Sequence, residues 1–205
     1  MEAGASRPGR WIKPVVFIVC LMPLVILGSR AIAGNLGANP IEAVIRNLGD
    51  WALRVLLLAL AVTPVRRLTG LAELARYRRM LGLFAFFYVV LHLSAYLVLD
   101  QFFDWEAIAH DIVKRRFITA GMAAFILLVP LAATSTHRMI RRLGARRWQR
   151  LHRGVYIAGS LAVLHYFFMV KADIRQPLVY AGVLATLFGV RAAYAATAHW
   201  RKASR

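Results

Sequence analysis

Three of the six histidines lie inside or beside stretches that are otherwise strongly apolar. His92 lies within residues 83–99, His165 lies within 156–170, and His152 lies just before that second stretch. An ionisable side chain is costly at membrane depth and needs a partner there. For several histidines that face the inside of a helix bundle, the best partner is a metal, which in a membrane is usually haem iron. The pattern therefore predicts a haem protein.

His92 and His165 are the pair whose positions match best. Both stretches are expected to run outward through the membrane, and each histidine falls in the outer half of its stretch. Imidazoles at equal depth on two helices can ligate one haem from its two faces. We predict both as axial ligands. The alternative for each is a buried histidine that hydrogen-bonds to a neighbouring helix.

His152 is predicted as an axial ligand of a second haem near the inner surface. It precedes His165 by about 20 Å of helix and points about 220° away around the axis. The third stretch carries Arg78 and Arg79 at the matching depth, and arginine can pair with a haem propionate but cannot ligate iron. The alternative is an interfacial histidine, so the haem count stays open at one or two. His137 is a reserve ligand for this inner site.

The elements that must position these histidines are membrane-spanning helices. The chain of 205 residues is 60% hydrophobic, which is too apolar for a soluble domain. A span needs about 20 mainly apolar residues. The sequence predicts an all-α, six-transmembrane-helix bundle that forms a single domain over residues 1–205. The expected spans are about 14–30, 48–64, 80–99, 117–133, 152–170 and 178–197.

The basic residues predict the orientation of these spans. With the N-terminus inside, the inner segments hold 18 basic and two acidic residues, and the outer ones hold eight basic and seven acidic residues. Such a bias predicts that both termini are cytoplasmic. It also explains the net charge of +18 without nucleic-acid binding. Ala31-Ile32-Ala33, after the first apolar run, leaves open a cleaved signal peptide, which would remove only that span.

Missing motifs restrict the source of electrons. The sequence has no glycine-rich dinucleotide-binding loop and no P-loop. Its one cysteine, Cys20, excludes an intramolecular disulfide and a self-contained iron–sulfur cluster. We therefore expect electrons to come from a lipid-soluble donor or from a separate flavin protein.

Short motifs along nearly the whole chain, about residues 10–200, occur in an order and spacing typical of one membrane family. They are Thr63-Pro64 with Arg66, Leu81-Gly82-Leu83, Leu91-His92-Leu93, Thr134-Ser135-Thr136, Arg142-Leu143-Gly144, Arg147-Trp148-Gln149, Leu151-His152, Val155-Tyr156, His165-Tyr166 and Pro177-Leu178-Val179-Tyr180-Ala181-Gly182. By these motifs the chain resembles the MsrQ (YedZ) family. That family in turn resembles the six-helix core of ferric reductases and NADPH oxidases without its dehydrogenase domain.

The resemblance implies a role in electron transfer at the bacterial inner membrane. It implies a haem b subunit that passes electrons from the quinone pool to a periplasmic molybdopterin-containing methionine-sulfoxide reductase, which repairs oxidised envelope proteins. The family's three histidines map onto His92, His152 and His165. The family is also associated with flavin mononucleotide (FMN), for which no residues can be assigned here, and a cytoplasmic flavin reductase is an alternative donor. Arg78 and Arg79 stand where the oxidase core carries a histidine, which puts the second haem in question.

Two other functions remain open at this point. The first is a membrane ferric or cupric reductase that acts without a dedicated partner. The second is a transporter that uses the histidines as a proton relay, for which acidic residues deep in the spans would be expected. No acidic residue lies deep in a predicted span.

Overall fold

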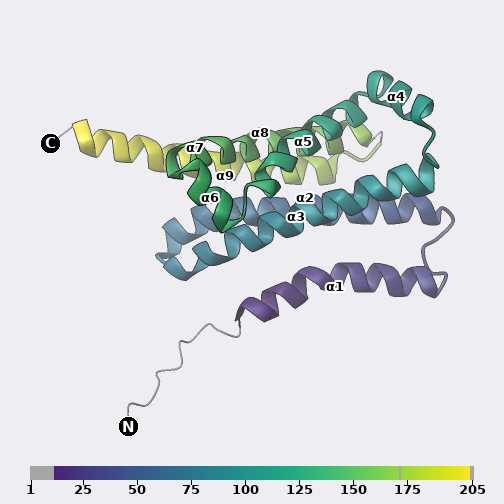
Figure 1. The fold of residues 1–205 in the computed structure, drawn as a ribbon, viewed down its shortest axis with the longest axis horizontal. Helices are drawn as coiled ribbons and strands as arrows, with labels where there is room; N and C mark the ends of the chain where they lie inside the picture. The colour runs from purple at the N-terminus through teal and green to yellow at the C-terminus, as the bar shows by residue number, and fades with distance from the viewer. Residues whose placement is uncertain (1–11, 171, 204–205) are drawn as a thin grey trace, which may run out of the picture.

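The computed structural model describes residues 12–170 and 172–203, and the side chains up to Thr197. This part of the chain is helical and contains no strand, which confirms the all-α prediction. Six long helices run along the molecule (Figure 1): α1 (Ile12–Ile32), α2 (Pro40–Thr69), α3 (Tyr77–Ala95), α5 (Arg116–Ala133), α8 (Gly154–Met169) and α9 (Arg175–Ala203).

Short helices replace the loops expected between spans. A 3₁₀ helix, η1 (Ala72–Arg76), precedes α3, and a π-helical turn, η2 (Tyr96–Asp100), extends it. The outer loop contains α4 (Trp105–Lys114), and the inner basic loop contains α6 (His137–Leu143) and α7 (Ala145–His152). Figure 1 shows α4 at one end of the bundle and α6 with α7 at the other.

The long helices pack mainly as two pairs. α3 lies along α2, and α5 lies along α8, whereas contacts between the two pairs are fewer. α9 packs on α8 and α2, and α1 lies at the edge against α2 and α3. Tyr88, fully buried on α3, donates a 2.7 Å hydrogen bond to the carbonyl of Cys20 on α1. The pairing leaves a space between the α2–α3 pair and the α5–α8 pair, where the histidines meet.

Apolar surface identifies an all-α polytopic membrane protein. Many large apolar side chains are exposed, such as Val25 on α1 and Ile126 on α5, and membrane lipid would cover them. Five helical stretches are long and apolar enough to cross a membrane: Ile12–Ile32, Pro40–Thr69, Ala72–Asp100, Arg116–Ala133 and Arg175–Thr197. The expected span 152–170 corresponds to α8, which has 16 residues and is therefore about 24 Å long. The count of six spans and the cytoplasmic termini stay predictions.

The second helix does not end at Pro64, as the sequence suggested. α2 continues to Thr69 and ends at Gly70, whose φ of 74° is the left-handed conformation that glycine adopts easily. Proline has no N–H, so the helix leaves the carbonyl of Leu60 without its usual partner. The Arg191 Nη2 donates a 2.6 Å hydrogen bond to that carbonyl from α9. A side chain from another helix therefore satisfies the backbone where the proline interrupts it.

Candidate functional site

His92 on α3 and His165 on α8 face each other across the space between the two helix pairs. Their ring centres are 6.1 Å apart, and the ring planes are nearly perpendicular, at 81°. Each residue comes from a different helix pair, as ligation from two sides requires. The structure thus brings together the two histidines that the sequence placed at equal depth.

Backbone carbonyls fix the orientation of both rings. The Nδ1 of His92 lies 2.9 Å from the carbonyl oxygen of Ile45 on α2, and the Nδ1 of His165 lies 2.5 Å from that of Phe117 on α5. A carbonyl can only accept, so each Nδ1 carries the proton and donates. The Nε2 atoms then keep their lone pairs, which is the usual state of a metal-binding imidazole.

Two glycines allow these close approaches. A Cβ atom on Gly49 of α2 would lie 3.0 Å from the His92 ring, and one on Gly121 of α5 would lie 2.7 Å from the His165 Nδ1. Gly49 follows Ile45 by four residues, and Gly121 follows Phe117 by four residues. Each glycine therefore lies one helical turn beyond the carbonyl that its histidine binds. Each helix pair therefore contains the same arrangement, a glycine that lets the histidine ring of the paired helix reach a backbone carbonyl.

A cavity of about 360 Å³ separates the two helix pairs at this level. His92 and His165 both line it, and the volume falls in the range of small-molecule and cofactor sites. Apolar side chains make up most of its wall. Polar and charged side chains also line it: Glu42, Arg46, Asp50, Tyr96, Asp100, Arg115 and Tyr166.

The donor set fits a haem. When one metal ion binds two imidazoles from opposite sides, each metal–nitrogen bond is about 2 Å long. Adding the distance from each nitrogen to the centre of its own ring places the two ring centres about 6 Å apart. The observed separation is 6.1 Å. Two imidazoles do not complete the shell of a common protein-bound metal ion, whereas a porphyrin brings four further nitrogen ligands. Among the described residues, no group of three or more His, Cys, Asp or Glu side chains gathers to hold a metal ion.

Comparison with known proteins places the chain in a family. The model of the family described as ferric reductase like transmembrane component matches residues 48–163. A protein of Rhodospirillum rubrum is 61% identical over 86% of this chain and 85% of its own length, and its name is protein-methionine-sulfoxide reductase heme-binding subunit MsrQ. The chain belongs to the MsrQ family. Relatives with the same name occur in Caulobacter vibrioides (51% identity, 84% of this chain and 82% of the relative) and Polaromonas naphthalenivorans (50%, 100% and 95%).

The third histidine that this family suggests lies outside the cavity. His152 ends α7 and stacks on Trp148 at 4.0 Å between ring centres. Its Nε2 lies 3.1 Å from the Thr134 hydroxyl, whose proton is directed to the Pro130 carbonyl at 2.6 Å, so Nε2 is best placed as the donor. Two of the family's motifs, around Thr134 and around Trp148, thus meet at this histidine.

The other histidines lie away from the facing pair. The Arg79 guanidinium donates a 2.8 Å hydrogen bond to the Nε2 of His137. This nitrogen of the predicted reserve ligand is therefore bound to an arginine. His110 is exposed on α4. The side chain of His199 falls outside those that the structure describes.

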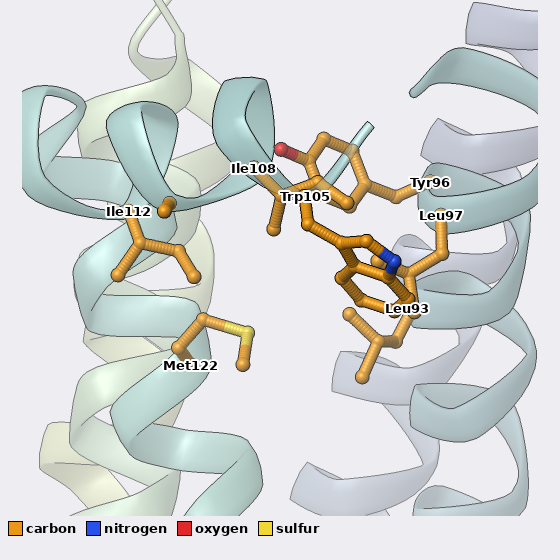
Figure 2. Close-up of a pocket in the computed structure, with 8 residues that line it drawn as sticks. Leu93, Tyr96, Leu97, Trp105, Ile108, Ile112 and Met122 are labelled. Carbon is orange, nitrogen blue, oxygen red and sulfur yellow. The ribbon is translucent and has the colours of Figure 1, made fainter. Parts of the chain in front are cut away.

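A second cavity, the outer apolar cavity, adjoins the first and has a volume of about 350 Å³ (Figure 2). Its lining comes from α3, η2, α4 and α5: Leu93, Tyr96, Leu97, Trp105, Ile108, Ala109, Ile112 and Met122. Leu93, Tyr96 and Met122 also line the histidine cavity, so the two cavities share these residues as a common wall.

Sequence reasoning missed several parts of this site. Gly49 was not singled out, because its role depends on which helix packs against α3. Arg46 and Arg115 were counted only as outer basic residues. The helix α4 was treated as a loop, although Trp105, Ile108 and Ile112 recur at the spacing of one helical face.

Proposed function

We propose that this chain is a haem-binding electron-transfer subunit of a protein-methionine-sulfoxide reductase, with His92 and His165 as the axial ligands of one haem b. The observation that carries the proposal is the facing pair of imidazoles. Both are protonated at Nδ1 by their hydrogen bonds, and neither Nε2 has a hydrogen-bond partner among the described residues. The names of the relatives support the same cofactor and the same system.

The protein's part is to hold and orient the cofactor. Ile45 and Phe117 fix the two imidazoles through their carbonyls, and the apolar wall of the cavity would keep water from a bound metal. Arg46 and Arg115 line the same cavity and would pair with the propionates. The bound haem supplies one-electron transfer, with a potential set by its ligands and by burial.

The proposal extends to the donor and the acceptor. Quinol in the bacterial inner membrane supplies the electrons, and a periplasmic molybdopterin-containing catalytic subunit receives them. The absence of a nucleotide-binding motif from the sequence supports a lipid-soluble donor. FMN and a cytoplasmic flavin reductase enter the proposal from family resemblance alone. The proposed topology has six membrane spans, with both termini in the cytoplasm.

The test is a reduced-minus-oxidised absorption spectrum of the purified protein, with haem quantified per chain. We expect a b-type spectrum that His92→Ala and His165→Ala each abolish or convert to a form with one protein ligand. His110→Ala is the matched control, since this histidine is exposed and lines neither cavity. An unchanged spectrum in both cavity variants would refute the assignment.

The same preparation decides the role of His152, which stays a predicted ligand. Two haems per chain, with one lost in His152→Ala, would establish it as a ligand of an inner haem. If the protein holds one haem per chain and keeps it in His152→Ala, His152 is not a haem ligand. Its role is then structural, through its hydrogen bond to Thr134 and its stacking on Trp148.

A second candidate is a ferric or cupric reductase that acts without a partner. The match to the ferric-reductase-like family model favours it. The pre-reduced protein should then pass electrons to chelated iron as fast as to the catalytic subunit. If the catalytic subunit oxidises the reduced protein much faster than chelated iron does, this candidate is rejected.

A further inference from the structure

The outer apolar cavity exposes almost no polar atom. Aliphatic side chains, one methionine and the rings of Tyr96 and Trp105 form its wall. The Tyr96 hydroxyl is engaged elsewhere, because it donates to the Asp111 Oδ2 at 3.2 Å. In Figure 2 the Trp105 indole lies beside Leu93 and Leu97 on one side of this space. A polar ligand group would lose its hydrogen bonds to water there without gaining others, so the wall fits a hydrocarbon chain.

The helix α4, which forms one side of this cavity, is amphipathic. Its apolar residues recur every three or four positions and line the cavity: Trp105, Ile108, Ala109 and Ile112. Its exposed polar residues lie on the other face: Glu106, His110 and Lys114. Phe102 and Phe103, just before α4, are 76% and 50% exposed. An amphipathic helix beside exposed aromatic rings is typical of the membrane–water interface, so the cavity lies where the acyl chains of the lipid begin.

The turn from α4 to α5 carries positive charge. Lys114 and Arg116 are exposed there, and neither forms an ion pair with a described side chain, whereas Arg115 between them is paired with Asp111. The other acid of α4, Glu106, lies in the first turn of that helix, away from its end at Lys114. Arg115 precedes α5 without capping it through a side-chain hydrogen bond. The first N–H groups of this 18-residue helix therefore add to the attraction for an anion.

The turn and the cavity have the separation of the two parts of a phospholipid. Arg116 precedes Met122, which lies in the cavity wall, by six residues, or about 9 Å along α5. A phosphate bound at the turn would leave that distance for the glycerol backbone and the first methylene groups of a chain inside the cavity. An anion without a chain would use only the turn, and an uncharged apolar ligand would use only the cavity.

We propose that the outer apolar cavity binds an acyl chain of an anionic phospholipid, whose phosphate is held at the α4–α5 turn by Lys114 and Arg116. The bound lipid connects α4 to α3 and α5, because all three helices contribute to the cavity wall. With the proposed topology, this lipid belongs to the periplasmic leaflet. The site needs neither the haem nor an electron donor, so its test is independent of the proposed function.

The first test fills the cavity from α4. Binding is measured by native mass spectrometry of the whole chain, freed of lipid in detergent and titrated with dioleoylphosphatidylglycerol. Ala109 lines only the outer cavity, so Ala109→Phe should weaken binding by roughly tenfold. His110→Phe is the matched control and should bind like the native chain, because His110 is exposed on the same helix and lines neither cavity.

Two further probes separate the parts of the lipid. Dioleoylglycerol has the same chains without the phosphate and should bind roughly tenfold more weakly. Glycerol phosphate has no chains and should not displace phosphatidylglycerol. Lys114→Gln with Arg116→Gln should remove most of the preference for phosphatidylglycerol over dioleoylglycerol. Arg141→Gln with Arg142→Gln should keep that preference, because these residues are exposed on α6 at the other end of the bundle.

A phosphatidylglycerol with a photoreactive diazirine in its acyl chain tests the native protein without any substitution. Its label should concentrate on residues 93–97 and 105–122, which contain the cavity wall, and unlabelled phosphatidylglycerol should displace it. Label spread evenly over the exposed apolar faces of α1 and α9, or equal affinity in Ala109→Phe and His110→Phe, would overturn the chain site. Dioleoylglycerol that binds as tightly as phosphatidylglycerol, or displacement by glycerol phosphate alone, would overturn an anionic phospholipid as the ligand.

Discussion

Two missing side chains, at Gly49 and Gly121, set the geometry of the histidine pair. Each glycine lets an imidazole lie directly against a helix backbone and donate to a carbonyl one turn earlier. A side chain there would push the ring away from its acceptor and turn its Nε2 out of line. The precision of the site therefore comes from α2 and α5 as much as from the helices that carry the histidines.

Alanine at these positions should reduce haem occupancy in a defined order. Gly121→Ala places Cβ at 2.7 Å from the His165 ring, closer than the 3.0 Å at Gly49, and should have the larger effect. Overpacking of this kind costs about 1–3 kcal/mol. Haem per chain and the ligand-sensitive absorption bands are the measurements. Gly182→Ala is the control, since its Cβ meets nothing within 4 Å; equal occupancy in all three variants would contradict the explanation.

Residue types and spacing predicted the facing pair, but they did not predict its surroundings. Two histidines in apolar stretches are visible as exceptions, and their depth follows from the direction of each span. Which carbonyl each ring binds depends on the packing and rotation of helices far apart in sequence, so Ile45 and Phe117 could not be identified. The contacts of His152 with Thr134 and Trp148 could not be predicted either, because these two residues approach it only in the folded chain.

At the level of elements, α2 and α9 are joined through a backbone group that Pro64 leaves free. The Leu60 carbonyl, without its helical donor, accepts from Arg191, whose Nε and Nη1 are buried without a hydrogen-bond partner among the described residues. The Arg191 guanidinium lies 5.0 Å from the centre of the Tyr156 ring, which adds a cation–π contact to α8. One side chain thus connects three helices.

A double-mutant cycle isolates this hydrogen bond. Pro64→Ala returns an N–H donor to the Leu60 carbonyl, so Arg191→Met should be less harmful in that background than in the native one. The single variants combine opposing effects, but the coupling energy should be about 1 kcal/mol. Thermal unfolding in detergent measures it. Additive effects of the two substitutions would show that the bond contributes nothing.

Element boundaries were predictable only where hydropathy changes sharply. The predicted span 117–133 agrees with α5 (Arg116–Ala133), because charged residues precede it and a turn follows it. α2 begins eight residues before the predicted start and ends five after the predicted end, since its polar turns extend beyond the apolar core. A window that searches for spans also overlooks amphipathic helices such as α4, which has only ten residues.

At the scale of the whole molecule, the six-span topology requires α8 to cross the membrane. Single introduced cysteines test this crossing, because the native Cys20 is buried. With six spans, Arg138→Cys should react with an impermeant maleimide only from the cytoplasmic side, and Val113→Cys and Asp173→Cys only from the periplasmic side. Labelling of positions 138 and 173 from the same side would show that α8 does not cross and would remove the six-span topology.

The division into two helix pairs has a consequence for how the protein is assembled. Each half-site is complete within one pair, since α2 orients His92 and α5 orients His165. Haem insertion would then be a late step that joins two preformed helix pairs, α2–α3 and α5–α8. Fragments 1–104 and 105–205, produced separately in one cell, should reconstitute the spectrum of the intact chain, whereas neither fragment alone should do so. In cells starved of haem, the two helix pairs would be inserted correctly but would not be held at a fixed spacing. Proteases would then cut the segment that connects them.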